Sequence, residues 1–297
     1  MVEADFSDKA TPNSRFYYSQ RLCLHFVDWG NEHKPLLLLI HGGKDHARSW
    51  DMVAKSLHNE YHIIAPDLRG HGDSSWAPGS MYSLLDSVLD IARLIEHLGA
   101  SDTSIIGHSY GGAVAILYAG FYPEHVKRLA VIEGLGPMTR RFAKSEDDPL
   151  WKRVKRWIEA TRRMENRTQY RFSSIQEAAE RIRTVITSLS AEQAEHIANH
   201  GLKQNDDNTF SWKYDDCSRI LSPLQFNAHE IREIERRIDC PTLFLYGANG
   251  WAGNPLSDNQ AHSFRYAQSI CIPEAGHWLH HDRLSLFLNT VRDFLND

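Results

Sequence analysis

The chain has 297 residues, of which 42% are hydrophobic, 10% aromatic and 24% charged. These values are typical of a globular protein near the upper size of one hydrophobic core, and they exclude a disulfide mini-scaffold, a coiled coil and a disordered chain. The net charge of −5 provides no overall positive field, so we expect neither nucleic acid nor a membrane surface as a partner.

Short apolar runs that alternate with amphipathic stretches predict a sheet between layers of helices. Seven segments are typical of strands, most of them buried on both faces: 21–29, 35–41, 61–66, 103–107, 129–132, 242–246 and 269–272. Helical spacing of apolar residues predicts five helices between and after them: 49–58, 81–98, 111–122, 229–238 and 284–294. This order predicts an α/β fold with a mostly parallel central sheet and helices on both faces.

The segment 137–226 interrupts this alternation. It has no buried-strand pattern and many charged residues, and 150–161 and 175–189 have the spacing of amphipathic helices. Acidic residues are interleaved with its basic stretch, which favours a solvated helix face over a docking patch for anions. Basic side chains near a pocket would still favour anionic substrates. We predict one core, 1–136 and 227–297, with a helical insertion at 137–226.

The sequence Gly107-His108-Ser109-Tyr110-Gly111 is a G-x-S-x-G motif between a predicted strand and a predicted helix. A nucleophile on such a tight turn requires flanking glycines, because side chains there would collide with neighbouring backbone. We therefore predict Ser109 as the nucleophile. The N–H groups of Tyr110 and of Gly43, which follows the strand 35–41, are the predicted oxyanion donors.

Four motifs in order, IHGG, PDLRGHGDS, GHSYGG and the late pair Gly276-His277, resemble the α/β-hydrolase superfamily over the whole chain. The resemblance implies an α/β-hydrolase fold of about eight strands, in which the insertion 137–226 is a helical cap over the active site. It also implies that His277 is the general base for Ser109, and that the stretch Asp67–Ser74 is structural. A serine requires such a base to become a good nucleophile.

The acid of the triad departs from the commonest pattern of this superfamily. Most relatives carry an aspartate shortly after the seventh strand, where this chain reads YGANGW (246–251) without a carboxylate; the first aspartate downstream is Asp258. Glu133 ends the predicted strand 129–132, and some members of the similar haloalkane-dehalogenase-like branch take their acid from this position. We favour Glu133 over Asp258 as the residue that orients His277, its alternative role being a loop hydrogen bond under the cap.

A serine nucleophile favours acyl transfer, because dehalogenases and epoxide hydrolases of this fold use aspartate. We expect a carboxylic ester hydrolase that acts on a small-molecule ester without a cofactor or metal. Its activity should fall below about pH 6–7, because His277 must be neutral. The alternatives are cleavage of a C–C bond, a lactone or a thioester by the same residues, and a non-catalytic ligand receptor.

The roles of several aromatic residues stay open, and the cysteines and the N-terminal residues indicate the cellular compartment. Six aromatic residues either line an apolar pocket or pack the cap on the core: Phe142, Trp151, Trp157, Phe172, Trp251 and Trp278. The scattered cysteines are expected to be buried, reduced thiols, and no histidine outside the predicted site shows metal-ligand spacing. With no secretory signal in residues 1–15 and no apolar run of membrane-spanning length, we predict a cytoplasmic protein.

Overall fold

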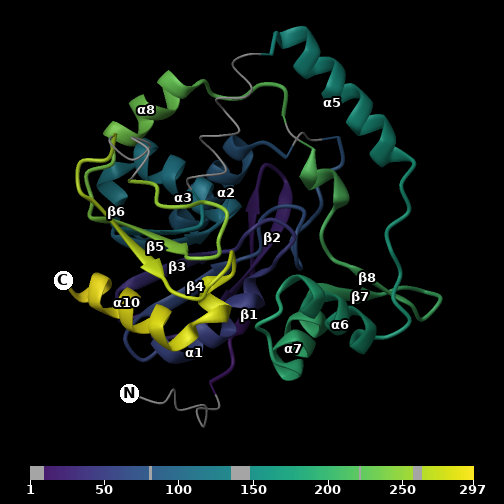
Figure 1. Cartoon of the computed structure of the whole chain (residues 1–297), viewed down its shortest axis with the longest axis horizontal. Helices are drawn as coiled ribbons and strands as arrows, with labels where there is room; N and C mark the ends of the chain where they lie inside the picture. Colours follow the sequence, from purple (N-terminus) through teal and green to yellow (C-terminus); the bar gives the residue numbers. More distant parts are fainter. Residues whose placement is uncertain (1–9, 80–81, 135–147, 221, 257–262) are drawn as a thin grey trace.

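The computed structural model of the chain describes residues 10–79, 82–134, 148–220, 222–256 and 263–297 (Figure 1). An eight-stranded sheet with the order β1-β2-β4-β3-β5-β6-β9-β10 forms its centre. The strands are β1 (Asn13–Ser19), β2 (Leu22–Asp28), β3 (Leu36–Ile40), β4 (His62–Pro66), β5 (Thr103–His108), β6 (Val126–Ile132), β9 (Thr242–Gly247) and β10 (Ala267–Ile272). β2 pairs antiparallel with β1 and β4, and the other neighbours pair in parallel. The predicted, mostly parallel sheet is confirmed.

Helices cover both faces of this sheet. They are α1 (Asp51–Leu57), α2 (Leu84–His97), α3 (Tyr110–Phe121), α8 (Ala228–Arg236), α9 (Leu279–Asp282) and α10 (Leu284–Asn296), with the 3-10 turns η1 (Ala47–Trp50) and η2 (Pro123–His125). Alternate residues of the buried strand β3 enter two separate hydrophobic clusters: Leu38 packs with α2 and α3, and Leu39 with α1 and α10. Figure 1 shows these helix pairs on opposite sides of the sheet. None of the described helices combines the length and apolar character needed to cross a membrane.

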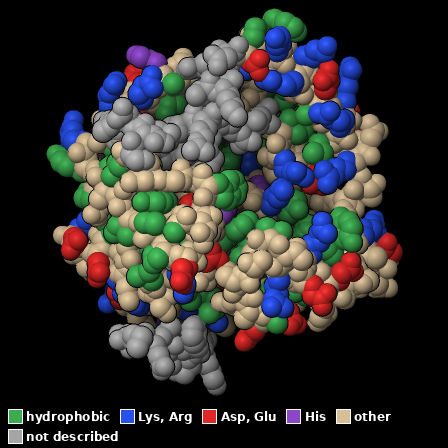
Figure 2. Space-filling model, viewed as in Figure 1, with side chains coloured by type: hydrophobic (Ala, Val, Ile, Leu, Met, Phe, Trp, Pro, Cys, Tyr) green, Lys and Arg blue, Asp and Glu red, His purple; other side chains and the backbone are tan. Residues whose placement is uncertain are grey.

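Between β6 and α8, the chain forms a body of short elements that we call the insertion (residues 148–220). Its elements are α5 (Leu150–Glu165), α6 (Ile175–Val185), α7 (Ala191–Gly201), the hairpin of β7 (Leu202–Gln204) and β8 (Phe210–Trp212), and η3 (Asp216–Arg219). A small cluster around the buried Phe172 holds it together. On the face shown in Figure 2, Lys and Arg side chains gather on the insertion side of a hollow.

The helix predicted over 175–189 is shorter in the structure. It ends at Val185, and α7 starts after Ser190, whose hydroxyl accepts a hydrogen bond from the N–H of Gln193 while the Gln193 side chain bonds back. This reciprocal capping box ends one helix pattern and starts another. The helix α7 and the short β7–β8 hairpin were not predicted, because neither shows a long apolar repeat.

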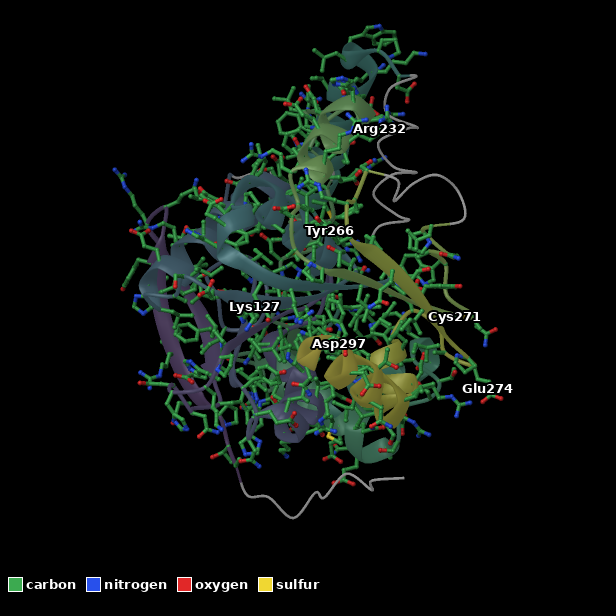
Figure 3. All side chains as sticks on the ribbon, turned by 90° about the vertical axis from the view of Figure 1, so that its left-hand side faces the viewer. Lys127, Arg232, Tyr266, Cys271, Glu274 and Asp297 are labelled. Atoms are coloured by element: carbon green, nitrogen blue, oxygen red, sulfur yellow. The ribbon has the colours of Figure 1, made fainter. Side chains whose placement is uncertain are left out.

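The last strand corrects two predictions. β10 lies at the edge of the sheet and exposes most of its side chains at least partly, so the expectation of a strand buried like β3 is wrong. An edge strand has a neighbour on one side only, which leaves its outer side open to solvent. Cys271 on this strand is exposed, and Figure 3 shows it at the outer edge. All four cysteines are free, but only Cys240 is buried.

Candidate active site

Ser109 lies on the tight turn between β5 and α3. Its backbone has φ 52° and ψ −113°, an unusual conformation for a residue with a side chain, and its N–H donates to the carbonyl of Ile132 at 2.8 Å. A Cβ on Gly107 would lie 2.5 Å from the carbonyl oxygen of Gly111, and one on Gly111 would lie 2.4 Å from that of Ile40. The turn is therefore closed by backbone contacts that only glycine permits, which accounts for both glycines of the motif.

Glu133 follows β6 with φ 51° and has a fully buried side chain. Its Oε1 accepts a hydrogen bond from the N–H of Gly247 at 3.0 Å, and its Oε2 accepts from the N–H groups of Trp251 and Ala252 at 3.2 Å each. A Cβ on Gly250 would lie 2.1 Å from Oε1. The loop 247–252 thus forms a cradle of backbone donors around this carboxylate, and Gly250 leaves the room for it.

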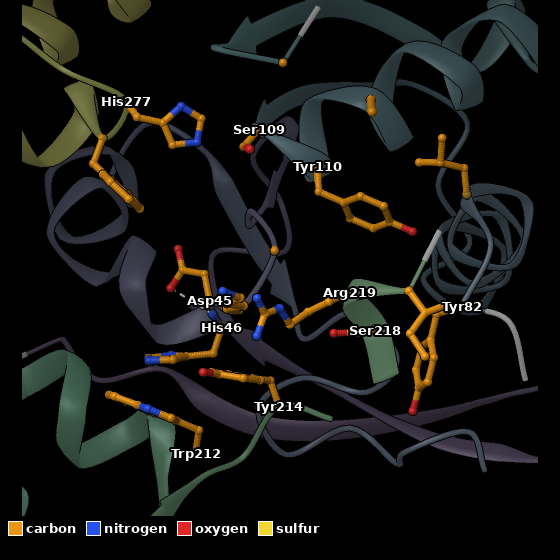
Figure 4. Close-up of a pocket in the computed structure, with 18 of the residues that line it drawn as sticks. Asp45, His46, Tyr82, Ser109, Tyr110, Trp212, Tyr214, Ser218, Arg219 and His277 are labelled. Atoms are coloured by element: carbon orange, nitrogen blue, oxygen red, sulfur yellow. Dashed lines mark hydrogen bonds between the residues drawn. The ribbon is translucent and has the colours of Figure 1, made fainter. Parts of the chain in front are cut away.

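The imidazole of His277 lies between this carboxylate and the serine. Its Nδ1 is 3.3 Å from Oε2 of Glu133, and the indole of Trp251 stacks on the ring with centroids 3.8 Å apart. From the other side, Nε2 of His108 donates to the His277 backbone carbonyl at 2.9 Å. Figure 4 shows the His277 ring facing the Ser109 hydroxyl, although no hydrogen bond joins the two side chains in the described structure. The three predicted residues come together at the carboxyl ends of β5 and β6 and after β10.

The two predicted oxyanion donors also border this space. Gly43 and Tyr110 line one cavity with Ser109, and neither of their N–H groups has an acceptor among the described residues. The adjacent Gly42 is packed so tightly that a Cβ on it would lie 3.2 Å from the Cβ of Ser109. Burial raises the pKa of the Tyr110 phenol to about 12, so this side chain stays neutral and bonds Ser87 at 3.0 Å. Two free N–H groups beside a serine can bind a developing negative charge.

The PDLRGHGDS stretch holds the loops under this site. Asp67 accepts from the N–H of Ala47 and pairs with Nδ1 of His25, both at 2.7 Å. Burial raises the pKa of Asp67, but the hydrogen bond and the charge of His25 outweigh burial and hold this pKa well below its usual range. Arg69 donates to both oxygens of Asp90 at 2.7 Å. These satisfied contacts fit a structural role for the stretch.

His41 fixes the Gly42–Gly43 turn. Its Nδ1 donates to the carbonyl of Gly42 at 2.7 Å, and its Nε2 accepts from the N–H of Leu68 at 3.0 Å. Burial lowers the pKa of this imidazole to about 3, so it stays neutral. Each ring nitrogen has one backbone partner, which leaves this histidine no proton to exchange with a ligand.

The cavity above Ser109 measures about 1060 Å³ and is lined by both the core and the insertion. Of the aromatic candidates, Trp251 and Trp278 line it, Phe172 packs inside the insertion, and Trp151 on α5 is exposed and lies away from it. Phe142 and Asp258 lie outside the described residues. Lys44, which follows the predicted donor Gly43 in sequence, also lines the cavity, and the structure adds four lining residues for which the sequence held no signal: Tyr82, Trp212, Tyr214 and Arg219.

One histidine cluster contradicts the expectation that metal-ligand spacing is absent. His196 and His200 stand one turn apart on α7, and a ligand atom of each lies within 4.8 Å of a carboxylate oxygen of Asp51. The guanidinium of Arg48 already donates to both oxygens of Asp51, at 2.8 and 3.0 Å. This cluster has the donor types for a transition metal, but the positive charge of Arg48 on the same carboxylate opposes a cation there.

Comparisons with known proteins agree with this architecture. Residues 35–284 match the family described as the alpha/beta hydrolase fold. A protein of Haemophilus influenzae, provisionally named an esterase/lipase, is 28% identical over 88% of this chain and 83% of its own. The serine hydrolase-like protein of Danio rerio is 25% identical over 75% and 68%. Epoxide hydrolase 4 of Mus musculus is 40% identical, but the match spans only 37% of this chain and 31% of that protein.

Solved structures extend the likeness to almost the whole chain. A hypothetical protein from Pseudomonas aeruginosa PAO1 superposes with a TM-score of 0.82 and 26% identity over 95% of this chain and 97% of that one. The thioesterase domain from the curacin biosynthetic pathway has a TM-score of 0.81 at 24% identity, over 95% and 99%, which is a likeness of fold. With its sheet order, its strained serine turn and a family match over most of its length, this chain belongs to the alpha/beta hydrolase fold family.

Proposed function

We propose that the protein is a carboxylic ester hydrolase that acts through Ser109, His277 and Glu133. The observation that carries the proposal is the Glu133 carboxylate, 3.3 Å from Nδ1 of an imidazole that faces the serine hydroxyl (Figure 4). An ionised carboxylate only accepts hydrogen bonds, so Nδ1 holds the proton and Nε2 presents its lone pair to the serine.

In the proposed reaction, Ser109 Oγ attacks the ester carbonyl carbon while Nε2 of His277 takes the hydroxyl proton. The N–H groups of Gly43 and Tyr110 bind the oxyanion, and Glu133 stabilises the imidazolium. The imidazolium then protonates the leaving alkoxide, which departs as the alcohol. Water then gives a proton to His277 and attacks the carbonyl carbon of the acyl-enzyme. The acid leaves as His277 passes the proton to Ser109 Oγ.

The nucleophile argues for esters over the epoxides named in some relatives. Epoxide hydrolase 1 of Caenorhabditis elegans aligns with 96% of this chain at 26% identity. In this chain a serine occupies the strained turn. A serine that opened an epoxide would form an ether without a carbonyl carbon for water to attack, whereas a serine acylated by an ester forms an ester that water can hydrolyse. Thioesters, lactones and C–C bonds next to a carbonyl would pass through the same acyl-enzyme and are the secondary substrates of the proposal.

We propose further that the chain divides into a core, 1–136 and 227–297, and a cap, 137–226. Arg181, Trp212 and Arg219 of the insertion line the same cavity as Ser109, which supports this role. The free cysteines, with Cys271 exposed, fit the reducing conditions of the cytoplasm, where we place the protein.

The test is reaction with a fluorophosphonate probe and turnover of a panel of 4-nitrophenyl esters. The purified protein should be labelled and should hydrolyse short esters, and Ser109→Ala should abolish the labelling and reduce kcat by at least about 10⁴-fold. Thermal unfolding of the variant serves as the folding control. A folded protein that neither reacts with the probe nor hydrolyses any ester contradicts the proposal.

A further inference from the structure

We propose that the cavity contains a carboxylate-binding subsite formed by Lys44 and Arg219, and that the preferred substrate is an ester that carries a free carboxylate. This inference rests on the proposed ester hydrolase function and names its substrate class. The two cations come from different parts of the molecule, Lys44 from the core loop and Arg219 from the insertion.

Both side chains are placed to reach a bound substrate. Lys44 directly follows Gly43, the predicted oxyanion donor, and lines the same cavity as Ser109. Arg219 ends η3, and Figure 4 shows its side chain extending into the cavity between Tyr110 and Tyr214. A guanidinium offers paired donors to a carboxylate and a lysine adds a compact charge, so the two complement each other around one anion.

Neither cation has a counter-ion that satisfies it. Lys44 makes no hydrogen bond or ion pair with any described residue. The nearest acid of Arg219 is Asp216, at 3.8 Å, and Arg167 shares that carboxylate at 3.6 Å. Burial and then the charge of Arg219 lower the pKa of Lys44, and the charge of Asp216 raises it. Lys44, Arg219 and Arg167 thus share the carboxylate of Asp216, and a bound anion would add the negative charge that the two cavity-lining cations lack.

The other charged groups that line this cavity already have partners. Asp45 accepts from Ser49 Oγ and Lys213 pairs with Asp73; Arg181 lies over the Tyr170 ring, and Glu230 accepts from the N–H of Asn227. The two acids of the wall thus make hydrogen bonds with neighbouring residues of the chain and form no ion pair with Lys44 or Arg219 in the described structure. This contrast places the subsite at these two residues.

Matched substrates test the inference. Mono-4-nitrophenyl adipate carries a carboxylate on the acyl side and 4-nitrophenyl hexanoate does not; 4-acetoxybenzoate and its methyl ester form the same contrast on the alcohol side. We expect kcat/KM to be at least about tenfold higher for the anionic member of one pair, chiefly through KM. Added salt should reduce this ratio.

Variants test whether Lys44 and Arg219 cause the preference for the anionic ester over the neutral one. Lys44→Gln and Arg219→Gln should each lower the anionic-to-neutral ratio by about tenfold, whereas the matched control Arg156→Gln should keep it. Arg156 is an exposed arginine of α5 that does not line the cavity. A ratio near or below one in the wild type, or a ratio that neither variant changes, overturns the subsite while ester hydrolysis stands.

A binding measurement keeps the two proposals separable. By calorimetry, Ser109→Ala should bind the adipate monoester at least about tenfold more tightly than the hexanoate ester, and a second change, Arg219→Gln, should remove the difference. If no ester is hydrolysed, the ester hydrolase proposal fails, and this difference still decides the subsite: equal affinities overturn it.

Discussion

The core and the insertion are held together by different means, and they supply different parts of the site. The core strand β5 and almost all of α3 are buried, so Ser109 is fixed between two packed elements. In the insertion, α5 has no buried residue, and one small cluster around Phe172 does the packing. Much of its link to the core is polar, as in the bond from Trp76 Nε1 to the Lys213 carbonyl.

The two regions therefore have different parts in the proposed reaction. The core holds Glu133 3.3 Å from His277 and fixes Ser109 on a packed turn, and such fixed positions matter because a reaction tolerates little displacement. The insertion adds aromatic and cationic side chains to the other wall of the cavity. Because few of its residues are buried, its sequence can change with less effect on folding. Changes in the buried core should therefore affect rate and folding, whereas changes in the insertion, and in Lys44 at the cavity wall, should affect which substrate is preferred.

After Ser109→Ala, the largest effect is expected from removing the charge of Glu133. Glu133→Gln keeps the shape but offers His277 an amide, which favours the wrong tautomer, so kcat should fall by about 10² to 10⁴-fold. The measurement is ester hydrolysis, and Asp258→Asn is the matched control. Loss of activity in Asp258→Asn but not in Glu133→Gln would reverse our assignment of the acid.

The second largest effect is a difference in folding stability between a core variant and an insertion variant. Leu39→Ala removes a fully buried side chain beneath α1 and α10 and should lower the free energy of unfolding by about 2–5 kcal/mol. Trp151→Ala on α5, where 64% of the side chain is exposed, should change it by less than about 0.5 kcal/mol. Urea unfolding measures both, and a comparable cost for the two variants would show that α5 packs as firmly as the core.

A smaller effect is expected from filling the cradle of Glu133. In Gly250→Ala the new Cβ would lie 2.1 Å from Oε1 of Glu133, so the carboxylate must leave the position in which Oε2 is 3.3 Å from Nδ1 of His277. We expect kcat to fall by about 10 to 100-fold. Gly253→Ala, next to this loop, has nothing within 4 Å of the added Cβ but a φ of 67°, so it is the control for backbone strain without a clash with Glu133 and should keep most of the activity. Equal activities of the two variants would mean that the cradle is not needed.

The smallest effect concerns acid pH and the histidines of the core. Burial lowers the pKa of His108 and of His280 well below the usual value, and that of His281 to about 4. Below about pH 6.5 the unfolded chain takes up protons that the folded chain refuses, so stability should fall as the pH falls from there towards 4. Glu235, whose pKa burial raises to about 7, opposes this trend as a single group.

His280→Phe isolates one of these contributions. The ring stacks on Trp50 with centroids 4.6 Å apart, and neither of its nitrogens has a hydrogen-bond partner in the described structure. A phenyl ring should keep the stacking and reduce the loss of stability on acidification by up to about 1.4 kcal/mol per pH unit. Urea unfolding at pH 7 and pH 5.5 measures the change; an unaltered pH dependence would exclude His280 as a source.

Local patterns made much of this structure predictable. The central strands appear as apolar runs, and the serine turn appears as one short motif between a strand and a helix. Of its two glycines, Gly107 is required by a local contact with Gly111, whereas Gly111 is required by contacts with Ile40 and His41 of another strand end. The start of α7 was missed, although Ser190 and Gln193 have the spacing of a capping box.

What could not be predicted depends on residues distant in sequence. The donors around Glu133 come from the loop 247–252, more than a hundred residues downstream. The stacking of Trp251 on His277 and the meeting of Lys44 with Arg219 have no periodic signal either. β10 resembles a buried strand in composition, and its exposure follows from its place in the sheet order, which composition does not encode.

The pairing of β6 with β9 has a consequence for how such a site can change. Their carboxyl ends are neighbours, so Nδ1 of His277 is within reach of a carboxylate from either strand end. In this chain Glu133 is the proposed acid, and residues 247, 251 and 252 at and after the end of β9 donate backbone hydrogen bonds to it. The acid of such a triad can therefore stand at the end of either strand while the imidazole keeps its position.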